Sequence, residues 1–301
     1  MRILVLGAGG IGGYFGGRLL QAGRDVTFLV RPARAAKLAE TGLVIKSPFG
    51  DAMLPHPPTV VKGTYDLVLL SCKAYDLDSA IESIAPVVGA ETAIVPLLNG
   101  MRHLDVLDQR FGAHRVLGGV AIAALTLDDA GQILHLNKNQ TITFGERDGS
   151  PSARAQAIES ALGGANFEAK LSEQIVLEMW EKWVLLATLA AATCLMRASV
   201  GDIIAAGGGA FMTSMLNESI AIARHAGYPP RDPVLERVRG IVTAEGSTLT
   251  ASMLRDVERG SLTEADHILG DLIRRAGGDS QLLGLAYLHL KAYEARRART
   301  P

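Results

Sequence analysis

The stretch that decides the fold lies at the amino terminus, where a short apolar run leads into a cluster of glycines: Arg2-Ile3-Leu4-Val5-Leu6-Gly7-Ala8-Gly9-Gly10-Ile11-Gly12. The run from 2 to 6 is typical of a buried β-strand, and the pattern from 10 to 22 predicts a helix that ends at Gly23. The glycines match G-x-G-x-x-G, which indicates a dinucleotide site when it follows a strand and opens a helix. The candidate cofactor-binding residues here are Gly7, Ala8, Gly9, Gly10, Ile11 and Gly12.

Each glycine of this motif has a physical role in such a site. Gly7 permits the tight turn, Gly9 lets the backbone approach a pyrophosphate, and Gly12 allows the helix to pack closely on the strand. The helix N-terminus then offers unpaired N–H groups to the anion. A glycine-rich structural turn is the alternative, and the strand-turn-helix context favours the nucleotide.

The first 170 residues alternate short β-branched runs with helical patterns, which predicts β-α-β units on a doubly wound parallel sheet. Expected strands cover 25–30, 66–71, 92–98 and 167–171, and expected helices cover 33–41, 77–84 and 152–162. The stretch from 116 to 144 suggests further strands, with a turn at 128–131. Beyond residue 172 the pattern is helical, with helices expected at 173–196, 211–226, 233–243, 262–275 and 282–299. We therefore expect an α/β domain over 1–170 and an all-α domain over 171–301.

Composition excludes several other classes of protein. With 301 residues, 30 basic and 31 acidic, the net charge is −1, which gives no support to a nucleic-acid partner. Two cysteines, Cys72 and Cys194, supply neither a disulfide framework nor a Cys-rich metal site, so we expect a reducing cytoplasm and no metal. The apolar runs at 3–6 and 183–196 are too short for a signal peptide or a membrane span. The Ala- and Leu-rich helical half is compatible with a homodimer or with a closed core.

The end of the second expected strand indicates the cofactor. A site that prefers NAD normally has Asp or Glu there, whereas this chain reads Phe28-Leu29-Val30-Arg31-Pro32. Arg31 suits a 2′-phosphate, with Arg34 or Lys37 helping, so we expect NADP. A solvated loop arginine is the alternative. Two further polar residues, Lys73 and Asn99, follow expected strands at the edge where open α/β sheets bind their ligands.

The motifs taken together resemble the ketopantoate reductase (2-dehydropantoate 2-reductase) family over nearly the whole chain. The similar segments are the glycine motif, Arg31, Ser71-Cys72-Lys73-Ala74-Tyr75, Asn99-Gly100-Met101, Trp180-Glu181-Lys182, 251–256 and 263–266. The resemblance implies a Rossmann domain joined to an all-helical domain. It also implies NADPH-dependent reduction of a small 2-oxo acid, 2-dehydropantoate, to pantoate on the way to pantothenate and coenzyme A.

On the cofactor side, the resemblance puts Arg31 on the 2′-phosphate, Lys73 near the cofactor and Asn99 where nicotinamide ribose and substrate meet. A small-residue strand around Ala123 would lie under the nicotinamide end, and Glu264 would border cofactor and substrate.

On the substrate side, the resemblance makes Lys182 the proton donor and Ser252 a ligand of the substrate carboxylate. Hydride transfer to a ketone leaves negative charge on oxygen, and a lysine can protonate it when desolvation lowers the lysine pKa. The apolar surroundings of Lys182 on its expected helix suit that role. The alternative is a surface pair between Glu178 and Lys182, which are spaced i,i+4.

One departure from the family pattern concerns the substrate. The family often carries asparagines where this chain has Leu186, Ala190 and, further on, Val200. A polar substrate group facing Leu186 would lose a hydrogen bond, at a cost of about 1–3 kcal/mol. A larger or more apolar 2-oxo acid is therefore an alternative substrate. The sequence is also compatible with a 3-hydroxyacid or polyol dehydrogenase and with an NADP-binding sensor without activity.

Overall fold

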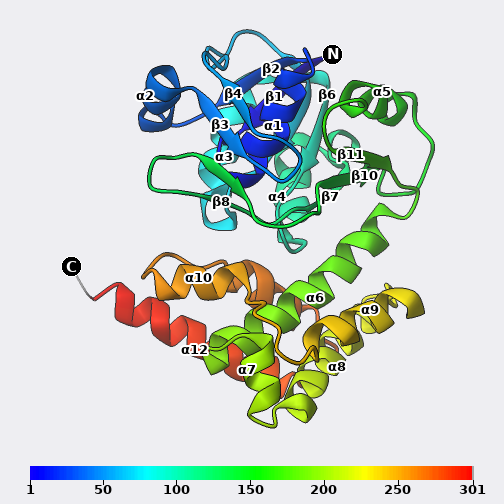
Figure 1. Ribbon diagram of the computed structural model, residues 1–301. Coiled ribbons are helices and arrows are strands. Elements are labelled where there is room, and N and C mark those ends of the chain that lie inside the picture. Colours follow the sequence, from blue (N-terminus) through cyan, green and yellow to red (C-terminus); the bar gives the residue numbers. More distant parts are fainter. Residues whose placement is uncertain (300–301) are drawn as a thin grey trace. The chain divides into compact units, whose positions relative to one another are not determined.

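A computed structural model describes residues 1–299, which form two compact units (Figure 1). The N-terminal unit comprises Met1–Leu98 and His103–Val176, and the helical unit comprises Asn99–Arg102 and the chain from Leu177 onward. Four residues from the first half of the sequence thus belong to the helical unit. Whether two domains that fold independently meet between 170 and 171 stays a prediction.

The N-terminal unit is built on the parallel sheet that the sequence predicts. Its strand order is β2-β1-β5-β6, with β1 at Arg2–Leu6, β2 at Asp25–Leu29, β5 at Tyr65–Leu70 and β6 at Val88–Pro96. Apart from the exposed Arg2 and Asp66 near their starts, the central strands β1 and β5 are buried and mostly apolar, because helices cover both faces of such a sheet. Those helices are α1 (Gly10–Gln21), α2 (Pro32–Thr41), α3 (Leu77–Ile84) and α4 (Arg102–Phe111). The α/β fold expected from the sequence is confirmed.

The other strands of this unit form two mixed sheets rather than an extension of the parallel one. One sheet has the order β11-β10-β7, and the other has the order β4-β3-β9-β8. The turn at 128–131 joins β8 to β9 as an antiparallel hairpin, since a short turn cannot connect parallel strands. The remaining elements are β3 (Leu43–Lys46), β4 (Ala52–Leu54), β7 (Gly118–Ile122), β8 (Leu125–Leu127), β9 (Ile133–His135), β10 (Thr141–Gly145), α5 (Ala153–Leu162) and β11 (Glu168–Leu171).

The helical unit is organised around α6 (Ile175–Met196), a helix of 22 residues. Residues Ala187, Ala191 and Cys194 are fully buried along it. Thr188 donates a buried hydrogen bond to Ser219 of α8 at 3.2 Å, which ties the two helices together. The other helices are α7 (Val200–Ala205), α8 (Gly209–His225), α9 (Asp232–Val242), α10 (Ser252–Glu258), α11 (Asp271–Arg274) and α12 (Gln281–Arg297). Of the helices that the structure describes, none has the length and apolar character needed to cross a membrane.

The helix expected over 262–275 is present in its later part, but it starts about three residues later than expected and is not regular. The Thr263 hydroxyl accepts the Ala265 N–H and donates to Glu294, which favours a non-helical approach. The helix then starts with a π-helical turn, η4 (Asp266–Gly270), before α11. The indole N–H of Trp183 donates to the Ile268 carbonyl within that turn at 2.9 Å. This buried bond fixes α6 against η4.

We expect Trp183→Phe to lower the free energy of unfolding by about 1–3 kcal/mol, because it removes the buried hydrogen bond to the Ile268 carbonyl. Urea denaturation followed by circular dichroism measures the change. Leu288→Ala on α12 is the control, since that side chain is 64% exposed and its loss should change stability little. Equal stability of Trp183→Phe and the wild type would contradict the assigned bond.

Candidate active site

The glycine loop lies between β1 and α1, and its backbone geometry excludes side chains at two positions. Gly7 has φ +92°, which L side chains rarely adopt. A Cβ on Gly12 would collide with the Gly7 carbonyl oxygen and with the Ser71 hydroxyl. Ser71 itself donates to the Leu6 carbonyl at 2.7 Å. The loop is thereby closed against the end of β5.

Gly9 differs from these two glycines because the space beside it is open. A Cβ built on Gly9 has no atom within 4 Å. Gly9 is also the N-cap of α1, with no side chain that caps the helix and no acidic residue in its first turn. The first N–H groups of α1 are therefore available to an anion, and the open side of Gly9 lets it come close. These residues fit the pyrophosphate of a dinucleotide.

Arg31 is the N-cap residue of α2, and its side chain is 71% exposed. Its guanidinium forms an ion pair with Asp76 at 2.5 Å. Asp76 ends the short 3-10 helix η1 (Ala74–Asp76), which directly follows Lys73. The structure thus brings the loops after β2 and β5 together, as the sequence predicts for a sheet of this kind. Asp76 was not among the candidate residues predicted from the sequence.

The other two basic residues considered for a 2′-phosphate have different surroundings. Arg34 is half-buried and donates to the Ala8 and Gly131 carbonyl oxygens, each at 3.1 Å. Lys37 lies 3.4 Å from Glu40 on the same helix. Of these three residues, Arg31 has the most exposed side chain, at 71% against 40% for Lys37.

Ala123 and Lys73 complete the candidate residues of the N-terminal unit. Ala123 is half-buried and lies one residue beyond β7, so the small-residue strand expected around it is present but ends just before it. The chain leaves the strand there to enter β8, which pairs with a different sheet. Lys73 is half-buried and precedes η1. Their expected contacts with a cofactor stay predictions.

Lys182 lies on α6 and is half-buried. Burial lowers its pKa to about 8, and the nearby negative charge of Glu264 acts in the opposite direction. Glu264 is itself buried, with 8% of its surface exposed, and it lies two residues before the π-helical turn begins. The burial of Lys182 favours a chemical role over an exposed pair with Glu178.

The residues on either side of Lys182 are tied to other parts of the helical unit. Trp180 stacks on Tyr228, with 5.6 Å between ring centroids. The buried Glu181 accepts hydrogen bonds from the Arg231 backbone and guanidinium. Together with the bond from Trp183 to η4, these contacts fix the turn of α6 that carries Lys182.

Asn99 belongs to the helical unit because the next residue packs on η4. Gly100 has φ +78°, and a Cβ there would lie 2.9 Å from the His267 carbonyl oxygen. His267 is buried, and burial lowers its pKa. The structure therefore keeps Asn99 in the same unit as Lys182 and Glu264, although more than 80 residues separate them along the chain.

Ser252, the remaining predicted substrate residue, is exposed and is the first residue of α10. The N–H of the preceding Ala251 lies 3.3 Å from the Thr193 hydroxyl oxygen on α6 and donates to it. The start of α10 is thus held on the helix that carries Lys182. All four residues assigned to the substrate side or to its border with the cofactor, Asn99, Lys182, Ser252 and Glu264, are in the helical unit.

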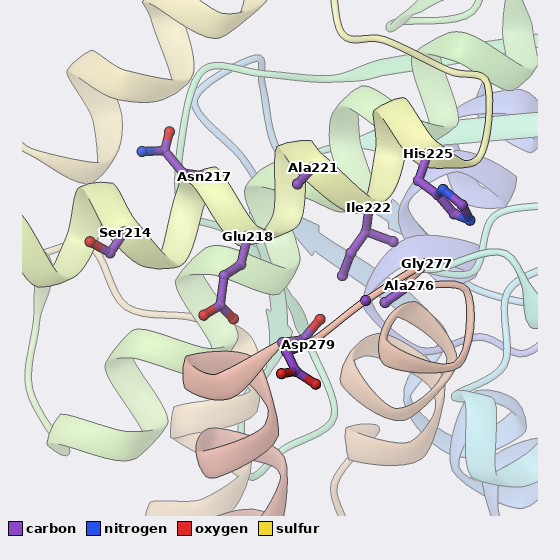
Figure 2. Close-up of a pocket in the computed structure, with 11 residues that line it drawn as sticks. Ser214, Asn217, Glu218, Ala221, Ile222, His225, Ala276, Gly277 and Asp279 are labelled. Carbon is purple, nitrogen blue, oxygen red and sulfur yellow. The ribbon is translucent and has the colours of Figure 1, made fainter.

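A separate hollow of about 540 Å³ lies between α8 and the loop that precedes α12 (Figure 2). It contains none of the predicted site residues. Glu218, on its α8 side, accepts the N–H groups of Leu282 and Leu283 and so caps α12. Glu218 thus has a structural role at this hollow.

A parallel sheet with an open glycine loop, and a half-buried lysine of lowered pKa, are typical of a nicotinamide-dependent oxidoreductase. Two family models match the chain, "Ketopantoate reductase PanE/ApbA" over 3–149 and its C-terminal counterpart over 174–279. The chain belongs to the ketopantoate reductase family and is an oxidoreductase of that family.

Individual relatives agree with this assignment. "Uncharacterized oxidoreductase YkpB" of Bacillus subtilis is 38% identical, covering 99% of this chain and 100% of that protein. The crystal structure of a 2-dehydropantoate 2-reductase from Geobacter metallireducens has a TM-score of 0.88 at 27% identity. The match covers 97% of this chain and 99% of that chain. The structure of D-mandelate dehydrogenase with NADH and anilino(oxo)acetate shares the fold, with a TM-score of 0.88 at 20% identity. The match covers 99% of this chain and 100% of that chain.

We expect Gly9→Val to abolish binding of NADPH, because a branched side chain would fill the open space beside the first turn of α1. Fluorescence titration with NADPH measures binding, and circular dichroism should remain that of the wild type. Undiminished binding by a folded Gly9→Val variant would remove the pyrophosphate from this loop.

Arg31→Ala is expected to raise the KM for NADPH at least tenfold while barely changing that for NADH, since only NADPH carries the 2′-phosphate. Asp76→Asn is the matched variant. It should lower the KM for NADPH, because it removes the carboxylate that now pairs with Arg31. Steady-state kinetics with both cofactors gives these values. Equal effects of Arg31→Ala on both cofactors would show that Arg31 does not read the phosphate.

Proposed function

We propose that the protein catalyses NADPH-dependent reduction of a 2-oxo acid to a 2-hydroxy acid, with 2-dehydropantoate as the first candidate substrate. The proposal depends mainly on Lys182, because burial lowers the pKa of its ammonium group to about 8. The family assignment supports it, as does the Geobacter relative named 2-dehydropantoate 2-reductase. With that substrate, the product pantoate would serve the synthesis of pantothenate.

The choice of NADPH is supported by the N-terminal unit. No carboxylate ends β2, and the exposed Arg31 stands in its place. A guanidinium is a strong ligand for phosphate. When bound, NADPH supplies a hydride for the substrate carbonyl carbon. The glycine loop and α1 would hold its pyrophosphate, and Lys73 would lie beside it.

Lys182 would donate the proton that the reduction requires. Hydride addition breaks the carbonyl π bond and places an electron pair on oxygen, and the ammonium of Lys182 protonates that oxygen. A lysine with a pKa of about 8 is a stronger acid than one at the ordinary 10.5, yet it remains mostly protonated at pH 7. Lys182 then recovers its proton from solvent.

The other residues of the helical unit would hold the substrate. The Ser252 hydroxyl would donate to the substrate carboxylate, and the Asn99 amide would bond the substrate near the nicotinamide ribose. Glu264 keeps a negative charge near Lys182, which limits how far burial lowers the pKa of that lysine. The direction of these effects suits a donor that is charged before the reaction and neutral after it.

A 2-oxo acid with a more apolar chain is the second candidate substrate, and the surface next to Lys182 favours it. Leu185 and Leu186 follow Lys182 by one helical turn and are half-buried, so part of each remains accessible. Ala190 and Val200 are buried. Leucine side chains stabilise an apolar substrate group and offer no partner to a hydroxyl.

Steady-state oxidation of NADPH with a panel of 2-oxo acids tests the proposal. The panel should contain 2-dehydropantoate and acids with branched aliphatic and aromatic chains. Turnover with at least one of them is expected, and the best substrate decides between the two candidates. If the protein binds NADPH but reduces none of them, it acts as a nucleotide-binding sensor and the proposed activity is wrong.

The pH dependence of kcat should follow the protonation state of Lys182. Because the ammonium is the donor, kcat is expected to be constant below about pH 8 and to fall tenfold per pH unit above it. Lys182→Ala should abolish turnover and retain NADPH binding, since the proton is needed only as charge develops on oxygen. Full activity of Lys182→Ala would contradict the mechanism.

Leu186→Asn combined with Ala190→Asn should raise kcat/KM for 2-dehydropantoate by about tenfold, if one good hydrogen bond to its hydroxyl is gained. The same variant should lose activity with an apolar 2-oxo acid. Steady-state kinetics with both substrates measures the change in preference. A wild type that is already efficient with 2-dehydropantoate, and is not improved by the asparagines, would contradict the apolar-substrate alternative.

A further inference from the structure

Arg34 joins the glycine loop to a hairpin that lies far away in the sequence. Its Nε donates to the Ala8 carbonyl oxygen at 3.1 Å, and its Nη1 donates to the Gly131 carbonyl oxygen at 3.1 Å. Ala8 is the second residue of the glycine motif, and Gly131 lies in the turn between β8 and β9. One planar guanidinium thus bridges two backbone segments, which a single ammonium could not do with the same geometry.

The turn that presents Gly131 is well ordered by its own hydrogen bonds. The Gly131 N–H donates to the Asp128 carbonyl at 3.0 Å, and the Gln132 N–H donates to the Asp128 carboxylate at 2.7 Å. Gly131 has φ +80°, and a Cβ there would lie 2.7 Å from Arg34 Nη1. The guanidinium therefore packs directly against this glycine.

The same hairpin also packs on the first turn of α1. A Cβ on Gly10 would lie 3.1 Å from the Leu125 Cβ of β8, and one on Gly13 would lie 2.6 Å from the Ile133 Cδ1 of β9. The hairpin thus covers one side of the region whose N–H groups face the open space at Gly9. Arg34 fastens the hairpin to the loop itself.

The state of the Arg34 side chain suggests that it is not there for stability alone. The side chain is half-buried, and burial lowers its pKa. Its third nitrogen, Nη2, is buried without a hydrogen-bond partner among the described residues. A buried donor without a partner destabilises the folded protein. A guanidinium at this position is explained if the shape of the glycine loop is important for binding the dinucleotide.

We propose that Arg34 is a positioning residue for the dinucleotide, a role that rests on the proposed function of the glycine loop. By holding the Ala8 carbonyl, Arg34 fixes the orientation of the following peptides and of the N–H groups that receive the pyrophosphate. The pyrophosphate is common to NADH and NADPH, whereas the 2′-phosphate is not. Arg34 therefore sets the affinity for both cofactors, and Arg31 sets the choice between them.

Fluorescence titrations with NADPH and with NADH test this division. Arg34→Ala should raise the Kd of both cofactors by the same factor, about tenfold, and Arg34→Lys should restore part of the loss. Arg31→Ala should raise the Kd of NADPH alone. A loss confined to NADPH in Arg34→Ala would show that Arg34 reads the 2′-phosphate, and unchanged affinities would show that the bridge is unimportant; either result overturns the proposal.

Gly131→Ala perturbs the same bridge from its other end, and it carries the test if Arg34→Ala does not fold. Gly131→Ala should weaken the binding of both cofactors. Combining it with Arg34→Ala should give no further loss of affinity, because both changes break the same contact. Gly50→Ala is the matched control: Gly50 lies in the β3–β4 turn with φ +98° and has no atom within 4 Å of its Cβ position. Additive losses, or an equal loss in Gly50→Ala, would overturn the proposal.

The wild type and Gly9→Val separate this proposal from the proposed function. A wild type that binds neither cofactor would remove the function of the glycine loop. A wild type that binds, with Gly9→Val that does not and Arg34→Ala that binds as the wild type does, would remove only the role of Arg34.

Discussion

The proposed chemistry depends on the burial of one ammonium group. Lys182 lies on the long helix α6, where removal from water makes its charged form less stable and lowers its pKa to about 8. Full burial without compensation would make the charged form too costly to keep. Glu264 opposes the effect and keeps the lysine within the range where it can both hold and release a proton near neutral pH.

A donor of this kind is useful only if its position is fixed, and the helical unit fixes it from several directions. Trp180, Glu181 and Trp183 make contacts with Tyr228, Arg231 and the π-helical turn, respectively. The same π-helical turn follows Glu264 and supports Gly100 beside Asn99. Within this turn, the Ile268 carbonyl accepts the indole N–H of Trp183, so the turn is tied directly to α6.

The elements with strong periodicity could be predicted from the sequence. The first strand and the helix at 77–84 have the predicted bounds, and Ser152 caps α5 by accepting the Ala155 N–H. Short elements such as β3, β4 and α10 were missed because a few residues carry little periodicity. For α7 a signal was present, since Ser199 and Asp202 form a capping box. The helix expected over 262–275 starts later than predicted because the Thr263 side chain competes with helical bonding there.

The candidate site was predictable to a different degree in the two units. The glycine motif and Arg31 follow from local sequence and sheet topology, whereas the pairing of Arg31 with Asp76 and the bridge made by Arg34 are long-range contacts that no local pattern contains. The same is true of Asn99, which joins the helical unit through the packing of Gly100 on His267. The lowered pKa of Lys182 depends on burial in the folded chain, which the apolar residues around it only suggested.

A direct titration of Lys182 tests the account most simply. Heteronuclear NMR of the protein labelled at the lysine side chains, with Lys182→Arg to assign the signal, reports the pKa of this ammonium without relying on any substrate. We expect a titration midpoint near pH 8, well below those of exposed lysines. A midpoint near 10.5 would show that the ammonium is solvated, and would contradict the role of Lys182 as the proton donor.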